Sequence, residues 1–142
     1  MLQTVINTIC EAAKWKAPFS NEKGERYFLL NDNTRLTLFS PDGQLVIMYV
    51  NLMPVSSENR AEGREDFIKK LAYNAAGLFK KRQSILSIEN DTVTLHRVLF
   101  PNACTPSYIK EQAKNLLNDA DICYTLLSRN NNSSPFSFST FF

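Results

Sequence analysis

The sequence contains few of the residues from which catalytic and nucleotide-binding sites are built. It has one histidine, His96, and only four glycines. It has no GxxxxGK[ST], GxGxxG or GxSxG motif, so neither a phosphate-binding loop nor a nucleophile elbow is expected. No nucleophile or regularly spaced carboxylate lies near His96 in the sequence, so we predict a structural or surface histidine. The composition therefore argues against an enzyme and against nucleotide chemistry.

The cysteines are also sparse. Cys10, Cys104 and Cys123 are far apart and form no CxxC pair, the spacing that metal and redox sites favour. We predict that they are buried apolar residues in a reducing compartment, with no metal. The N-terminus lacks the basic flank and the unbroken apolar stretch of a signal peptide, and no segment approaches the ~20 apolar residues of a membrane span. We therefore expect a cytoplasmic protein with no membrane partner.

Neither sign of charge is in large excess. Sixteen basic and fourteen acidic side chains give a formal net charge of +2, whereas nucleic-acid-binding domains of this size usually cluster positive charge. The basic run Lys80–Arg82 follows a predicted helix, where cations complement the negative end of the helix dipole. No nucleic-acid partner is expected.

Hydrophobic periodicity predicts the elements of the first half. Apolar residues recur at spacings of three and four from Leu2 to Lys16, which predicts an amphipathic helix closed by Pro18. Three runs rich in aromatic and β-branched residues then follow, separated by NDN and SPDG, and predict an antiparallel meander. The third run, Leu45 to Leu52, is apolar on both faces, which predicts a central strand covered on two sides.

The second half mixes helices with a hairpin. The polar residues 55–64 are predicted to form a loop, and helical spacing resumes over about residues 64–81. The strands SILSIE and TVTLHRVLF are joined at Asn90 and Asp91, a pair that tolerates a tight turn. A third helix begins at Thr-Pro, an N-cap followed by proline at the first helical position.

The order α-β-β-β-α-β-β-α predicts one α+β domain over residues 1–129, a twisted antiparallel sheet covered by helices. Residues 130–142 form a separate tail rich in Asn, Ser and Phe. No internal repeat is evident. The chain is thus expected to fold as one domain with a short C-terminal extension.

This pattern resembles the type III secretion chaperones of the Tir-chaperone (CesT-like) family. The resemblance rests on the opening amphipathic helix, the meander RYFLLNDNTRLTLFSPDGQLVIMY and the helix ending NAAGLF. It continues through the hairpin SILSIENDTVTLHRVLF and the segment PNACTPSYIKEQAKNLLNDADICYTLL, in which a strand ends at proline and a long helix follows Thr-Pro. The resemblance covers roughly residues 1–129.

The resemblance implies a virulence-associated homodimer in the bacterial cytoplasm. Such a chaperone holds the N-terminal segment of a secreted effector, its client, in an extended and secretion-competent form. The implied partners are the effector, a second copy of the chain, and the secretion ATPase or sorting platform. No catalysis, ATP, metal or other cofactor is implied.

Site residues follow from the same resemblance. In the family, the client surface comes largely from the first helix and the meander, where the candidates are Val5, Ile9, Phe28, Leu30, Leu36, Leu38, Met48 and Val50. For the first helix, an ordinary core face fits the pattern equally well. The dimer contact of the family centres on the second helix, where the candidates are Phe67, Leu71, Ala75 and Leu78.

Other functions stay open at this stage. The same fold could serve a regulator or adaptor of the secretion system, a nucleic-acid-binding sheet could use Lys80–Arg82, and an enzyme could assemble its residues only in three dimensions. The tail carries Phe136, Phe138, Phe141 and Phe142. We hypothesise that these rings shield an apolar groove when no client is bound; a frayed terminus is the alternative.

Overall fold

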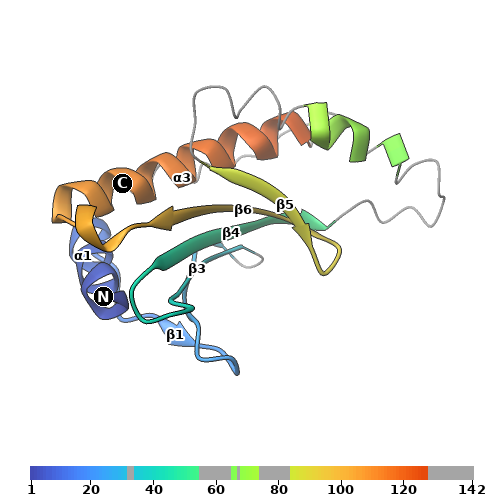
Figure 1. The fold of residues 1–142 in the computed structure, drawn as a ribbon. Helices are drawn as coiled ribbons and strands as arrows, with labels where there is room; N and C mark the ends of the chain where they lie inside the picture. The colour runs from blue at the N-terminus through green and yellow to red at the C-terminus, as the bar shows by residue number, and fades with distance from the viewer. Residues whose placement is uncertain (32–33, 55–64, 67, 74–83, 128–142) are drawn as a thin grey trace.

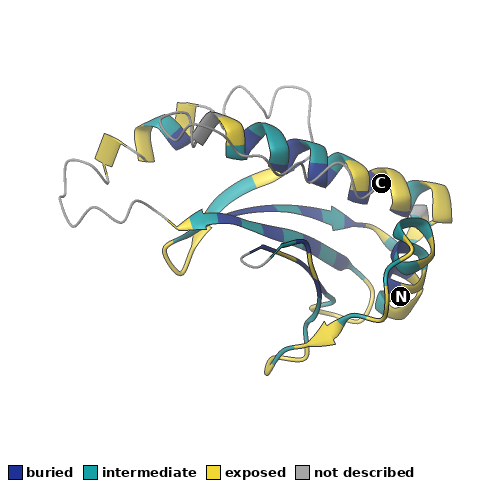
Figure 2. Ribbon diagram, turned by 180° about the vertical axis from the view of Figure 1, so that it is seen from behind, coloured by how far each residue is buried: buried dark blue, intermediate teal, exposed yellow. Residues whose placement is uncertain are grey.

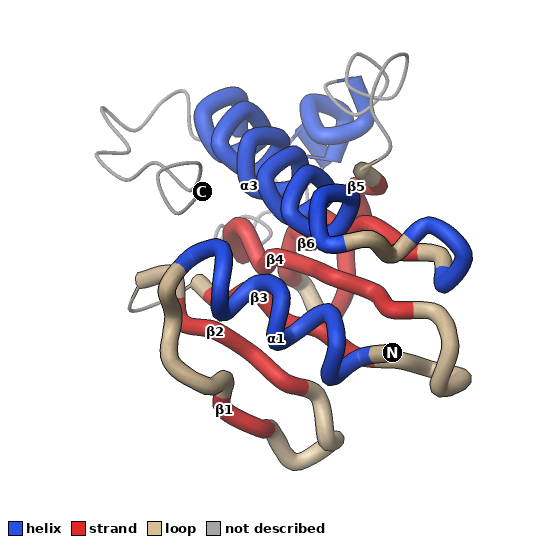
Figure 3. Tube along the Cα trace, turned by 90° about the vertical axis from the view of Figure 1, so that its left-hand side faces the viewer, coloured by secondary structure: helices blue, strands red, loops and turns tan. Residues whose placement is uncertain are grey.

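The computed structural model describes residues 1–31, 34–54, 65–66, 68–73 and 84–127. They form a six-stranded antiparallel sheet with two long helices packed on one face (Figures 1 and 3). The elements are α1 (Leu2–Ala13), β1 (Phe19–Ser20), β2 (Arg26–Leu29), β3 (Arg35–Phe39), β4 (Val46–Pro54), β5 (Ile85–Glu89), β6 (Thr92–Leu99), a 3-10 turn (Pro101–Ala103) and α3 (Pro106–Leu127). Residues 65–66 and 68–73 are helical, in agreement with the predicted second helix, whose remaining residues lie outside the described ones.

The strands are arranged in the order β1-β2-β3-β4-β6-β5. The two longest strands, β4 and β6, pair at the centre, from Val46 opposite Leu99 to Pro54 opposite Thr92, with a register shift between Asn51 and Met53. This pairing joins the predicted meander and the predicted hairpin into one sheet. The predicted α+β class and the antiparallel sheet covered by helices are confirmed.

Two local predictions differ from the structure. Helix α1 ends at Ala13 because Lys14 adopts a left-handed conformation with φ 57°, and the Trp15 N–H donates to the Cys10 carbonyl at 3.0 Å, as in common helix C-caps. Strand β1 was not predicted, because two residues are too few to show a period. It forms where Phe19 pairs with Tyr27.

The turns follow the predicted chemistry. Asn90 and Asp91 have φ of 52° and 57°, the left-handed values that a two-residue hairpin turn requires and that Asn and Asp tolerate. Between β3 and β4, the Asp42 carboxylate accepts hydrogen bonds from the backbone N–H groups of Gln44 and Leu45, each at 2.8 Å. These bonds are the main reason that the pKa of Asp42 is lowered.

A single apolar core lies between the helices and the sheet (Figure 2). Helix α1 contributes Val5, Ile6 and Ile9, and α3 packs on both β4 and β6. Strand β4 alternates buried and half-buried residues, so it is central as predicted, but only its inward face is fully covered. The cysteine prediction is confirmed for Cys123 and wrong for Cys10 and Cys104, which are half-buried.

A buried ion pair fixes α3 to the sheet. Arg97 on β6 and Asp119 on α3 approach to 3.1 Å, with side chains 6% and 1% exposed. The Arg97 guanidinium also donates to the Ser84 hydroxyl at 2.7 Å and to the Gln112 side-chain oxygen at 2.6 Å, and Ser84 donates to Asp119. Because Ser84 directly precedes β5, these hydrogen bonds connect α3 with both strands of the hairpin.

Candidate functional site

The eight residues predicted to bind a client lie in the core. Each is at most 5% exposed: Val5, Ile9, Phe28, Leu30, Leu36, Leu38, Met48 and Val50. Val5 and Ile9 lie on the buried side of α1. Side chains alternate between the two faces of a strand, and the other six residues lie on the side of the sheet that packs against α1 and α3. The prediction therefore selected the inward face, and we correct it. It selected positions for apolar character, and in a sheet covered on one side the most apolar positions point toward the core.

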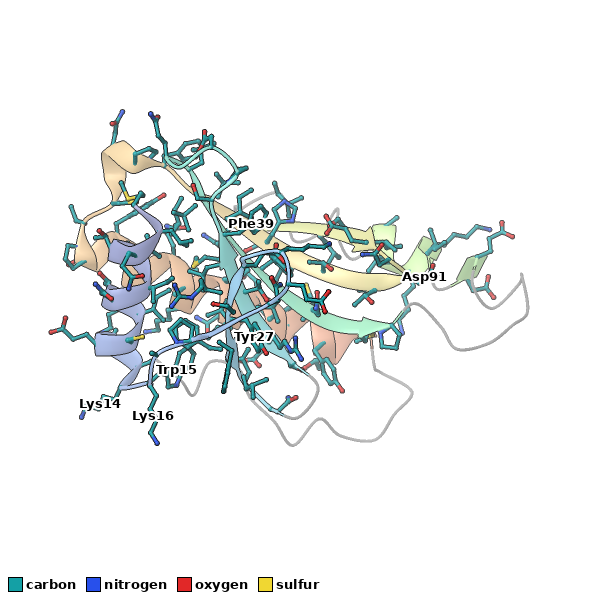
Figure 4. The ribbon with its side chains drawn as sticks, turned by 90° about the horizontal axis from the view of Figure 1, so that it is seen from below. Lys14, Trp15, Lys16, Tyr27, Phe39 and Asp91 are labelled. Atoms are coloured by element: carbon teal, nitrogen blue, oxygen red, sulfur yellow. The ribbon has the colours of Figure 1, made fainter. Side chains whose placement is uncertain are left out.

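The opposite face of the sheet, here called the outer face, carries the alternate side chains (Figure 4). One cross-strand row spans all six strands: Phe19, Tyr27, Thr37, Tyr49, His96 and Ile85. Directly opposed residues in antiparallel strands lie on the same side of the sheet. The outer face also includes the neighbours of this row: Leu29, Arg35, Phe39, Ile47, Asn51, Ser87, Glu89, Thr92, Thr94 and Val98.

Large apolar side chains of the outer face are exposed near both edges of the sheet. The exposed fractions are 56% for Phe19, 51% for Leu29 and 47% for Ile85. Scattered apolar residues are normal on a protein surface, but these three lie on one face of one sheet. Phe19 and Leu29 lie near one edge of this face and Ile85 lies on β5 at the other edge, so the sheet exposes apolar side chains at both ends of the row.

Aromatic rings give the outer face a fixed shape. Phe19 stacks on Tyr27 with ring centroids 5.5 Å apart, and the Arg35 guanidinium lies 4.3 Å from the centre of the same tyrosine ring. Phe39 meets Tyr49 edge-on at 6.0 Å. Each of these arrangements is a favourable one for an aromatic quadrupole, so the contacts help to hold the rings in place.

A pocket of about 440 Å³ hollows the outer face between the β1–β2 turn and the β5–β6 turn. Its lining residues come from five segments: Lys23 and Glu25; Phe39; Ile47, Tyr49 and Asn51; Glu89 and Asn90; and Thr92, Thr94 and His96. We call the residues from β3, β4 and β6 the floor, and the residues at the two turns (Lys23, Glu25, Glu89 and Asn90) the sides. The sequence prediction missed this site because its parts are far apart in the chain.

Tyr49 connects the floor of the pocket with one side. Its hydroxyl donates to Glu25 Oε1 at 3.3 Å. The pKa of Tyr49 is raised, first by partial burial and also by the negative charges of Glu25 and Glu89, while a hydrogen bond with Thr37 lowers it. Two carboxylates from opposite sides of the pocket therefore act on the same hydroxyl.

Of the predicted dimer residues, Leu71 is the one that the structure describes, on the helical segment 68–73 that precedes β5. Leu71 is 6% exposed and belongs to the core of the subunit, whereas Phe67, Ala75 and Leu78 lie outside the described residues. The same segment exposes other apolar side chains: Ile68 at 40% and Tyr73 at 83%. A contact centred on this helix stays a prediction, with Ile68 and Tyr73 as the accessible residues.

The remaining residues considered for chemistry or for other partners include His96 and the basic run Lys80–Arg82. His96 is half-buried and lines the pocket. No group of three or more His, Cys, Asp or Glu residues able to hold a metal ion occurs among the described residues. None of the described helices is both long and apolar enough to span a membrane. Lys80–Arg82 and the phenylalanines of the tail lie outside the described residues.

Comparison with solved structures identifies the fold. No protein-family model and no curated protein matches the sequence. A chain of the ExsC–ExsE complex superposes with a TM-score of 0.65 at 14% identity, over 89% of this chain and 96% of that one. A chain of the HopA1–SchA chaperone–effector complex gives 0.63 at 10% identity, over 86% and 91%.

A third similar structure contains a protein described as a type III secretion chaperone. A chain of the complex between the Yersinia pestis type III secretion chaperone SycH and a stable fragment of YscM2 gives a TM-score of 0.55 at 11% identity, over 84% of this chain and 97% of that one. At such identities the likeness concerns the fold. The chain therefore has the fold found in type III secretion chaperone complexes, over nearly the whole length of both chains.

Proposed function

We propose that this chain is a type III secretion chaperone that binds the N-terminal segment of a secreted effector in extended form in the bacterial cytoplasm. The observation that carries the proposal is the outer face, where exposed aromatic and aliphatic side chains lie on a fold shared with chaperone–effector complexes. The chain acts by binding rather than by catalysis. Membership of the Tir-chaperone family stays a prediction, since the comparisons support the broader class.

The physical argument concerns what an unfolded client needs. An extended segment exposes apolar side chains and backbone hydrogen-bonding groups along its length. The outer face offers exposed Phe19, Leu29 and Ile85 to the side chains. Among the described residues, β1 and β5 are the terminal strands of the sheet, and strands in this position suit backbone pairing with an extended segment. Binding of this kind keeps the client soluble without folding it.

We further propose that the chaperone is a homodimer and that the loaded complex is received by the secretion ATPase or sorting platform. Ile68 and Tyr73 on the helix, with Ile88 on β5 at 37% exposure, are accessible apolar residues that support a self-contact. The phenylalanine tail as an intramolecular occupant of the client surface stays a hypothesis.

The test uses the products of the adjacent reading frames as candidate clients, because secretion chaperones are commonly encoded beside them. Each product is co-expressed with the chaperone, and its N-terminal fragment is titrated into the purified chaperone by calorimetry. We expect one fragment to bind and to show no independent tertiary structure by circular dichroism. Limited proteolysis of the complex should protect a contiguous N-terminal stretch of the client.

Two results would contradict the proposal. The first is binding that depends on a folded C-terminal domain of the partner. The second is a bound partner that is never secreted, which would instead identify a regulator or adaptor with the same fold. Deleting the chaperone and measuring secretion of the partner separates these cases, because loss of secretion is expected only for a chaperone.

A further inference from the structure

The pocket on the outer face differs in chemistry from the apolar patches around it. Glu25 lies at one side, next to β2, and Glu89 lies at the other side, at the end of β5. The rings of Phe39 and Tyr49 lie between them and meet edge-on at 6.0 Å. The pocket therefore combines two carboxylates with aromatic surface, a set of groups that favours a cation.

The two carboxylates act jointly on the pocket rather than on separate surface positions. Both raise the pKa of the same Tyr49 hydroxyl, after the larger effect of burial. The negative charges of both sides therefore reach the same side chain of the floor, although the chain as a whole has a formal net charge of +2. Lys23 and His96 also line the pocket. The Lys23 side chain is exposed, so water can solvate its ammonium group.

We propose that this pocket holds an arginine side chain of the client's extended segment. The inference rests on the proposed function, because it names the part of the client that this site receives. A guanidinium is planar, stacks on aromatic faces and donates to carboxylates in a fixed geometry, whereas a lysine ammonium is a compact and strongly hydrated charge. The volume of about 440 Å³ accommodates one long side chain and is at the small end for ligand pockets.

The outer face already contains this chemistry within the chain. Arg35 places its guanidinium 4.3 Å from the centre of the Tyr27 ring, on the adjacent part of the same face. That pair shows that an arginine and a tyrosine of this sheet reach the cation–π distance range. In the pocket, the tyrosine and the carboxylates come from the chaperone, and the guanidinium comes from the client.

The first experiment uses Nα-acetyl-arginine amide as the probe, with no client present. Two-dimensional amide NMR of the full chain is recorded during titration to about 50 mM, because a single side chain binds in the millimolar range at best. We expect shifts confined to the lining of the pocket, at residues 23–25, 39, 47–51 and 89–96. The neutral isostere Nα-acetyl-citrulline amide should produce shifts at least about fivefold smaller.

Charge variants test which groups are responsible. Glu25→Gln and Glu89→Gln should each weaken arginine-amide binding by up to about fivefold, the range for partly exposed ion pairs. Lys23→Gln should strengthen it, because a competing cation is removed. Glu111→Gln is the matched control: Glu111 is an exposed carboxylate on α3, the helix on the opposite face of the sheet, so its removal should change nothing.

The outcomes separate this inference from the proposed function. Equal binding of the citrulline amide, stronger binding of Nα-acetyl-phenylalanine amide, or no shift at the pocket would each overturn the arginine site. The client titrations described above do not depend on this probe. A client that binds while the arginine amide fails would remove only the inference, whereas failure of every candidate client would remove the function.

Discussion

The strongest stability prediction concerns the buried pair Arg97–Asp119. The Asp119→Ala variant would leave a guanidinium that is 6% exposed without its counter-charge, although Ser84 and Gln112 still accept hydrogen bonds from it. Removing one member of a buried pair costs about 3–5 kcal/mol, a large part of the roughly 5–15 kcal/mol that stabilises a typical domain. With a urea dependence of about 2 kcal/mol per molar, the unfolding midpoint should fall by about 2 M.

Two further variants make the reasoning refutable. Arg97→Met combined with Asp119→Leu removes both charges, so neither charge is buried alone. We expect the double variant to recover part of the loss, because the buried Ser84 and Gln112 still lose their hydrogen bonds to Arg97. Glu111→Ala on the exposed side of α3 should stay within about 0.5 kcal/mol of the parent. Urea unfolding followed by circular dichroism measures all three. A loss under about 1 kcal/mol for Asp119→Ala, or a double variant no more stable than the single one, would refute the argument.

Three other predictions follow from the outer face and the helical segment. Leu29→Asp should abolish client binding in calorimetry and leave the fold intact. Phe100→Asp is the control, at a similarly exposed phenylalanine after β6, and should retain binding. Loss of binding in both variants would argue against a specific site on the outer face. Tyr49 should ionise above the usual pKa of 10.0. Its contribution to stability is therefore present below about pH 10 and is lost as the pH rises through the raised pKa. Glu89→Gln should lower the pKa of Tyr49 in an ultraviolet titration, and an unchanged pKa would show that the Glu89 charge does not act on this hydroxyl. Ile68→Asp should convert a dimer into a folded monomer in analytical ultracentrifugation, since burying an unpaired charge is costly; a wild-type monomer would contradict the dimer.

Much of the fold was predictable because its signals are local. The SPDG and Asn-Asp turns delimit strands, and Thr-Pro marks the start of α3. The core was also largely visible, but it was assigned to the client. The polar residues of β3 could have indicated the correct face. Arg35 and Thr37 alternate with Leu36 and Leu38, so the leucines point toward the core when only one face of the sheet is covered.

The pocket could not be predicted in the same way. Its lining unites turn residues near position 25 with turn residues near position 89, and nothing local relates these two segments. They meet because β4 pairs with β6 across the centre of the sheet. Long-range strand order is the information that single-sequence periodicity lacks, since every antiparallel arrangement of these strands would show the same alternation.

The strict alternation of β4 has a consequence for the evolution of the sequence. Val46, Met48 and Val50 belong to the core, while Ile47, Tyr49 and Asn51 belong to the outer face. Odd-numbered positions of this stretch can therefore accumulate substitutions with little effect on folding, because core packing is decided by the even-numbered ones. Under the proposed function, the residues that contact the client and the residues that stabilise the fold are thus different, alternating positions of the same strand. A gene duplicate could acquire a new client through a few substitutions at the outer-face positions 47, 49 and 51. A combinatorial library restricted to these positions would reproduce that divergence in the laboratory.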